Sequence, residues 1–233
     1  MVRRIEVKDM SKVIIRSDTT PFPITVMGDY AGICWESEST PEKNYQRGLN
    51  CVESDHGRVM ELPQIYMILD GYSARVIREY YTHIGGSPTR LQSSTRYIDY
   101  EHGFDYIIPS SISANKRAKI AFETAMGNIE VTLKELDRLG IPREDSAMLL
   151  PLGMTTKVVV RTNLRNLVDM SRQRMCSRAY WEFRKLMNDI VEALSEYSDE
   201  WKTLVEMTFM PKCEEYSYCT EKNSCGRKPK KEE

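Results

Sequence analysis

The sequence has no apolar stretch close to the ~20 residues that a membrane-spanning helix needs. Its first six residues, MVRRIE, lack the apolar core of a secretory signal peptide. An excess of one charge is also missing: 33 Lys and Arg face 34 Asp and Glu, which leaves no overall positive field for a nucleic-acid backbone. These absences argue against membrane and nucleic-acid partners, and we expect a cytoplasmic protein.

Metal-binding patterns are scarce as well. The chain has six cysteines and three histidines, and no two histidines show metal-ligand spacing. Cys213, Cys219 and Cys225 lie near the C-terminus with five residues between neighbours, so the CxxC pairs of a convincing zinc site are absent. A cytoplasmic setting also disfavours a disulfide framework. The sequence therefore predicts no metal, and thiols that are reduced and partly buried.

Familiar enzyme signatures are missing too. No nucleophile-elbow sequence supports a Ser-His-Asp triad. The pair Gly85-Gly86 is too short for a dinucleotide fingerprint, and it follows an expected helix rather than a strand. We interpret this pair as a turn.

What is present is typical of a soluble globular domain. A chain of 233 residues with 41% hydrophobic and 29% charged residues can bury a substantial core. Runs of β-branched and apolar residues predict strands or extended segments at 13–15, 24–26, 65–69, 95–98 and 155–160, with Asp70-Gly71 ending the third. Helical composition predicts helices at 41–52, 73–81, 114–139, 163–174 and 178–197.

The expected helix at 114–139 has the plainest pattern. Its apolar residues recur every three or four positions, and Gly140 and Pro142 follow as stop signals. The predicted apolar face consists of Ala118, Ala121, Ala125, Ile129, Leu133 and Leu136. Together these elements predict an α/β fold, a single mixed domain with a small sheet and several long helices at 1–211. A polar, Cys-containing tail, solvated in our interpretation, follows at 212–233.

Arginines are grouped in a way that suggests anionic ligands. Five of them fall between residues 161 and 178, and on a helix Arg174 lies about two and a half turns beyond Arg165, so the two point to different sides. Guanidinium groups bind phosphates with two parallel hydrogen bonds. In an extended segment, Ser94 and Arg96 would project the same way and share a ligand. The alternative is a solvated, salt-bridged helix face.

At this point the chain resembles a known family, the flavin-dependent thymidylate synthases. Their signature can be written R-H-R-x-x-S-x-N-E-x-S-x-R-Y, and the sequence keeps its central His83 and its closing Ser94-x-Arg96-Tyr97. Both arginines beside the histidine are missing, and two residues are inserted before Arg96. Further elements match in order and spacing: His56 to Glu61, Gly71-Tyr72-Ser73, Leu150-Pro151-Leu152, Asn163-Leu164-Arg165, Arg174 and Trp181-Glu182. The resemblance identifies a divergent member.

The resemblance implies a role for each matched residue. Substrate (dUMP) contacts fall on Gln92, Ser94, Arg96 and Arg174. Contacts to FAD fall on His56, Arg58, His83, Asn163, Arg165 and Asp169. Among these, Arg174 and Ser94 are the expected catalytic residues: Arg174 stabilises charge on the uracil oxygens, and Ser94 forms a hydrogen bond rather than acting as a nucleophile. One family arginine is replaced at Ser146-Ala147, and Arg90 and Arg143 are candidates for its phosphate-binding role.

The implied reaction is the reductive methylation of dUMP to dTMP. The resemblance implies FAD as cofactor, NAD(P)H as reductant, methylene-tetrahydrofolate as carbon donor, and a homotetramer. Two alternatives remain open. One is a related flavoenzyme that modifies another pyrimidine nucleotide, because fold does not fix substrate. The other is a non-catalytic nucleotide- or flavin-binding module with a decayed signature.

Overall fold

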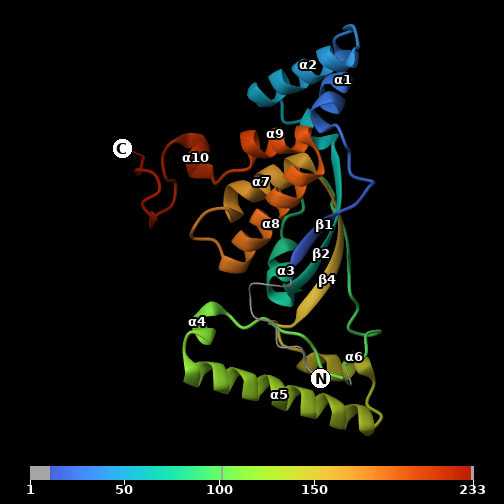
Figure 1. Ribbon diagram of the computed structural model, residues 1–233, viewed down its shortest axis with the longest axis vertical. Helices are drawn as coiled ribbons and strands as arrows, with labels where there is room; N and C mark the ends of the chain where they lie inside the picture. The colour runs from blue at the N-terminus through green and yellow to red at the C-terminus, as the bar shows by residue number, and fades with distance from the viewer. Residues whose placement is uncertain (1–10, 101, 232–233) are drawn as a thin grey trace. The chain divides into compact units, whose positions relative to one another are not determined.

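The structure is a computed structural model, and it describes residues 11–100 and 102–231. The start of the chain and the last two residues of the expected tail lie outside this part. The described chain divides into two compact units made of interleaved segments (Figure 1). Unit 1 contains residues 11–12, 69–81 and 91–159, and unit 2 contains 13–68, 82–90 and 160–231. Among the described helices, none combines the length and apolar character that crossing a bilayer requires.

A four-stranded sheet has the order β1-β2-β4-β3. Its strands are β1 (Lys12–Ile15), β2 (Gln64–Ser73), β3 (Thr89–Gln92) and β4 (Thr155–Asn163). The pairing of β2 with β4 is antiparallel: Leu164 N donates to Pro63 O at 3.2 Å near one end, and Ala74 N donates to Met154 O at 2.8 Å near the other. Both strands begin in one unit and end in the other, so the expected single mixed α/β domain with a small sheet is confirmed.

Unit 2 is mainly helical. Its helices are α1 (Pro23–Cys34), α2 (Pro41–Glu53), the short 3-10 turn η1 (Val59–Glu61), α7 (Leu164–Arg174), α8 (Trp181–Tyr197), α9 (Asp199–Thr208) and α10 (Lys212–Tyr216). The core of this unit includes Leu167, Phe183, Leu186 and Trp201, which are completely buried. As predicted, α2 starts at Pro41, and the Thr40 side chain accepts a hydrogen bond from Lys43 N.

Residues 24–26 were expected to form a strand, and that prediction is wrong. They lie in the first turn of α1, which starts with Pro23. The Glu200 carboxylate of α9 accepts hydrogen bonds from Ile24 N at 2.7 Å and Thr25 N at 3.0 Å. A residue 175 positions away therefore caps this helix, and local β propensity does not decide the outcome.

Unit 1 is built around the long helix α5 (Lys116–Arg138). The other helices are α3 (Ala74–Tyr80), α4 (Ser110–Ser113), α6 (Arg143–Ser146) and the 3-10 turn η2 (Ala147–Leu149). The predicted extent of α5 is confirmed, and its predicted apolar face is confirmed in part: Leu133 is buried and Ile129 packs against the core cluster. Ala121 and Ala125 are exposed, and the larger Met126, which was not predicted, is buried in this part of the helix.

Two sequence boundaries also differ. Asp70-Gly71 does not end β2, which continues to Ser73, and Gly71 has φ 79° within the strand. Residues 95–98 form a turn rather than an extended segment, since Ile98 N donates to Ser94 O at 3.1 Å. The third strand lies just before this turn.

The segment after Pro211 makes contacts with the rest of unit 2, although most of its described residues are exposed. Arg172 of α7 pairs with Glu215 of α10 at 2.7 Å, and Arg178 donates to Asn223 O at 2.8 Å. Cys219 is 9% exposed. These contacts hold the described part of 212–233 against α7 and the loop that follows it. A domain boundary at 211/212 stays a prediction.

Candidate functional site

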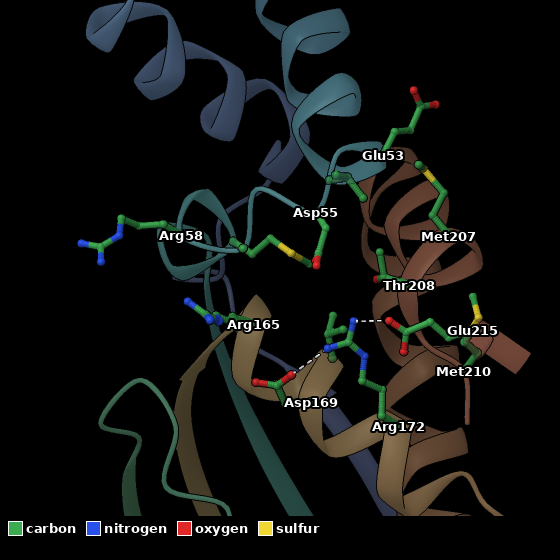
Figure 2. A pocket seen from close by; sticks show the side chains of 14 residues that line it. Glu53, Asp55, Arg58, Arg165, Asp169, Arg172, Met207, Thr208, Met210 and Glu215 are labelled. Carbon is green, nitrogen blue, oxygen red and sulfur yellow. Dashed lines mark hydrogen bonds and ion pairs between the residues drawn. The ribbon is translucent and has the colours of Figure 1, made fainter. Parts of the chain in front are cut away.

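A cavity of about 600 Å³ lies in unit 2. It is bordered by the end of α2, the loop that leads into η1, one side of α7, the end of α9 and α10 (Figure 2). Charged side chains and methionines dominate its wall: Glu53, Asp55, Arg58, Arg165, Asp169, Arg172, Glu215, Met60, Met207 and Met210. The size and the mixture of apolar and ionic groups are typical of small-molecule sites.

Three residues expected at FAD line this cavity together. Arg58 comes from the loop before η1, whereas Arg165 and Asp169 come from the first turns of α7. Folding brings these distant segments side by side. The Arg58 guanidinium extends away from the cavity centre (Figure 2) and makes no ion pair with any described residue.

The other arginines of the cavity are already paired. Arg165 contacts Glu61 at 2.5 Å, and Arg172 contacts both Asp169 at 3.0 Å and Glu215 at 2.7 Å. The salt-bridged alternative therefore describes Arg165 and Arg172 as they stand. Such half-exposed pairs contribute little to stability, so an anionic ligand can exchange with the carboxylates at low cost.

His83 and Arg174 meet outside this cavity but within the same unit. Arg174 Nε donates to His83 Nε2 at 3.0 Å, so this imidazole nitrogen is an acceptor. The Arg174 guanidinium lies 4.6 Å from the Phe183 ring centre, and His83 lies 5.6 Å from the same ring. Arg90 donates to the carbonyl oxygen of His83. The helix geometry expected from sequence therefore holds, with Arg165 and Arg174 in different surroundings.

Burial lowers the pKa of His83 from 6.5 to about 4, and the neighbouring Arg174 and Arg90 guanidinium groups act in the same direction. The imidazole is therefore neutral at neutral pH. A neutral imidazole beside a fixed guanidinium can orient that guanidinium without cancelling its charge.

Asn163 has a structural role that sequence spacing did not reveal. It is the N-cap of α7, and its Oδ1 accepts from Asn166 N at 2.9 Å. The Gly85-Gly86 turn lies directly on it: a Cβ on Gly86, where φ is 69°, would be 2.1 Å from Asn163 Nδ2. The glycines thus permit close contact between the loop of His83 and the start of α7.

Three residues expected at dUMP belong to unit 1. Arg96 is exposed and pairs with Glu144 at 3.1 Å. Ser94 Oγ accepts from Arg96 N at 3.3 Å, which closes the turn, and the Gln92 amide donates to Thr156 Oγ1 at 3.3 Å. Arg174, the fourth expected contact, belongs to unit 2.

The remaining candidates are at the surface. His56 is exposed and meets the Trp35 ring edge-on at 6.5 Å. Arg143, one candidate for the missing phosphate arginine, pairs with Asp99 at 2.6 Å.

The sequence did not reveal that Arg172 and Glu215 line the first cavity. Arg172 was visible only as one of five clustered arginines, and nothing in the sequence pointed to Glu215.

Comparison with known proteins supports the resemblance. The family described as "Thymidylate synthase complementing protein" matches residues 17–198. A flavin-dependent thymidylate synthase of Nitratidesulfovibrio vulgaris is 31% identical over 188 residues, which cover 76% of this chain and 74% of the relative. One from Pyrococcus furiosus is 26% identical over 237 residues and covers 98% and 95% of the two chains.

Solved structures agree at the level of fold. A Helicobacter pylori crystal structure, described as Thymidylate Synthase X with FAD and dUMP, superposes with a TM-score of 0.64 at 16% identity. The match covers 84% of this chain and 99% of that one. The family match over residues 17–198 includes every residue that the sequence predicts at FAD or dUMP, and the chain belongs to the thymidylate synthase complementing protein family as a distant, divergent member.

Proposed function

We propose that this protein is a flavin-dependent thymidylate synthase. It would convert dUMP to dTMP with FAD, NAD(P)H and methylene-tetrahydrofolate. The observation that carries the proposal is the family match over residues 17–198, which includes the cavity-lining Arg58, Arg165 and Asp169 as well as Ser94, Arg96 and Arg174. The relatives named above carry that same activity in their descriptions.

The cavity fits the cofactor chemically. FAD combines flat rings with a pyrophosphate, and the wall offers methionine side chains for the former and guanidinium groups for the latter. Arg165 and Arg58 are the residues proposed to hold the phosphates, and the Arg58 side chain, which extends away from the cavity centre, would turn inward on binding. Arg165 would exchange Glu61 for a phosphate oxygen, a change that keeps its charge paired. Bound reduced flavin supplies a hydride to the reaction.

Arg174 is proposed to contact the uracil ring. His83 and Phe183 fix its guanidinium, so it is oriented before substrate arrives. A preorientated donor that strengthens its hydrogen bonds as charge develops on the ring oxygens stabilises the transition state more than the ground state. The neutral state of His83 leaves the positive charge of Arg174 undiminished.

Gln92, Ser94 and Arg96 are proposed to hold dUMP, with Arg96 on the phosphate. Arg96 would exchange Glu144 for the phosphate, which accepts charge-assisted hydrogen bonds. We also propose a homotetramer. An assembly of this kind lets segments from several copies contribute to one nucleotide site.

An anaerobic spectroscopic titration tests the proposal. Purified protein should bind FAD and be yellow, and NADPH should bleach the flavin absorbance. With dUMP and methylene-tetrahydrofolate also present, dTMP should form. A protein that stays colourless in excess FAD contradicts the flavoenzyme proposal. A yellow protein that yields no dTMP favours the non-catalytic module.

A further inference from the structure

A second cavity of unit 2, about 370 Å³, is lined by four of the six cysteines. Cys176 lies just after α7, Cys213 lies on α10, and Cys219 and Cys225 follow in the C-terminal segment. The sequence showed only the last three as neighbours. Folding adds Cys176, which brings the number of thiols around one space to the four that a structural zinc site uses.

The thiols are held by the fold rather than grouped on a loose tail. The backbone of Cys219 is paired with the end of the chain: Cys219 N donates to Pro229 O at 2.7 Å, and Cys219 forms a parallel β-bridge with Lys230. Glu215, on the same helix as Cys213, pairs with Arg172 of α7 at 2.7 Å, and Arg178 donates to Asn223 O at 2.8 Å. These contacts hold the segment that carries three of the thiols beside Cys176, and all four thiols line the same cavity.

The charge of the cavity suits an anionic cluster. Five cationic residues line it against one acid, Glu221: Arg172, Arg178, Lys212, Arg227 and Lys228. Two of them are paired with carboxylates outside the lining or at its edge, Arg172 with Glu215 at 2.7 Å and Lys228 with Glu214 at 2.8 Å, which leaves an excess of positive charge. Four thiolates around one divalent ion have a net charge of about −2. Surrounding ammonium and guanidinium groups stabilise that charge, and they favour the thiolate form that metal binding needs.

We propose that Cys176, Cys213, Cys219 and Cys225 form a tetrathiolate site for Zn²⁺. Among the described residues, no three His, Cys, Asp or Glu side chains are already close enough together to hold a metal ion. Binding therefore requires the thiols to turn inward, and each protonated thiol releases its proton to solvent. The site would fasten residues 212–231 to the end of α7.

Metal content and cobalt substitution test this site in the full-length chain, whether or not it is a thymidylate synthase. Protein purified under reducing conditions should contain one Zn²⁺ per chain. After the zinc is removed, anaerobic titration with Co²⁺ should give thiolate-to-cobalt charge-transfer bands and the intense d–d absorption of a tetrahedral site. Absence of both metals, or cobalt binding without thiolate bands, overturns the proposal.

Serine variants identify the ligands. Cys176→Ser and Cys225→Ser should each weaken Co²⁺ binding by more than about 100-fold, because loss of outer-shell partners alone costs 10–100-fold. Cys34→Ser, which changes an exposed thiol on α1, is the matched control and should bind Co²⁺ like the parent. An unchanged cobalt spectrum in Cys176→Ser contradicts the site.

Disulfide formation is the competing outcome, and mass spectrometry separates it. Non-reduced, alkylated protein should carry six alkyl groups once zinc has been removed. Fewer groups, with a loss of two hydrogens per missing pair, would show disulfides in place of the metal site. If Cys176→Ser does not fold, the cobalt spectrum of the parent and of Cys225→Ser still decides the question.

Discussion

Individual arginines in this protein differ in what holds them, and this difference sets what their removal should do. Arg96 is exposed in a surface turn with one ion pair, whereas Arg174 is half-buried between an imidazole and an aromatic ring. Arg96 can therefore rearrange around an anion, whereas Arg174 is already held in one orientation.

Arg96→Ala should weaken dUMP binding by about one to two decades, because a charge-assisted contact to phosphate contributes about 1.5–3 kcal/mol. The flavin spectrum should hardly change. Titration of dUMP followed by flavin absorbance measures this. Arg138→Ala is the control, since Arg138 also forms an exposed ion pair in unit 1, with Glu135 at 2.6 Å. Equal dUMP affinity in the two variants would place the substrate elsewhere.

Arg174→Ala should lower kcat more than it weakens dUMP binding, because its proposed contact strengthens in the transition state. Arg165→Ala should instead weaken FAD binding more than dUMP binding, since Arg165 lines the cavity and Arg174 does not. Equilibrium dialysis with FAD, beside steady-state kinetics, separates the two. An Arg174→Ala protein that loses FAD and keeps its dUMP affinity would reverse our assignments.

His83 should make stability depend on pH. Its folded-state pKa of about 4 lies below the 6.5 of the unfolded chain, so between these values the unfolded state binds more protons. Above pH 6.5 the imidazole is neutral in both the folded and the unfolded state, so its pKa shift does not affect the free energy of unfolding. That free energy falls as the pH falls from 6.5 to 4. Allowing for solvent screening of a half-buried group, we expect a loss of about 1–2 kcal/mol. The melting temperature Tm, measured at several pH values across this range, should fall less steeply with decreasing pH in His83→Asn than in the parent.

At the scale of elements, the glycine turn against α7 gives a clean comparison. Gly86 and Gly140 both have positive φ, 69° and 74°, but a Cβ meets Asn163 at 2.1 Å in the first case and nothing within 4 Å in the second. Gly140→Ala should cost about 1–2 kcal/mol from backbone strain alone. Gly86→Ala should cost clearly more, because Asn163 must also give up its capping position. Denaturant unfolding of both variants checks this, and similar losses would show that the loop moves away freely.

The helices that the sequence predicted well have their capping and stop residues within or next to the helix itself. The helix that starts at Pro41 has Thr40 as a local cap, and α5 has a long apolar repeat followed by Gly140. Residues 24–26 were misjudged because their helix is capped by Glu200, which is remote in sequence. Local pattern specifies an element when its caps are local, and fails when the partner comes from elsewhere in the fold.

At the scale of the whole molecule, sequence could name the candidate residues but could not arrange them. Motif spacing identified Arg58, Arg165 and Asp169, and their common cavity appeared only in the structure. The same spacing gave no reason to join Cys176 to the three C-terminal thiols, because that neighbourhood depends on how residues 212–231 fold back on α7.

We expect the assembled protein to be a homotetramer. Sedimentation velocity at micromolar concentration, with FAD and dUMP present, should give a species of about four times the 27.1 kDa chain. Long α5 leaves Ile120 and Val131 exposed, which suits burial against another copy. A monomer under these conditions would contradict the expected assembly without bearing on the thiol cavity.

Arg172 borders both cavities of unit 2 and is paired with Glu215, which lies on the same short helix as Cys213. A ligand in the first cavity that draws Arg172 from Glu215 loosens the helix that carries one proposed metal ligand. Thermodynamic linkage makes such an effect reciprocal: the factor by which one occupant changes the affinity for the other must be the same in both directions. We therefore expect Arg172 to couple the binding of FAD in the first cavity to the binding of metal in the second.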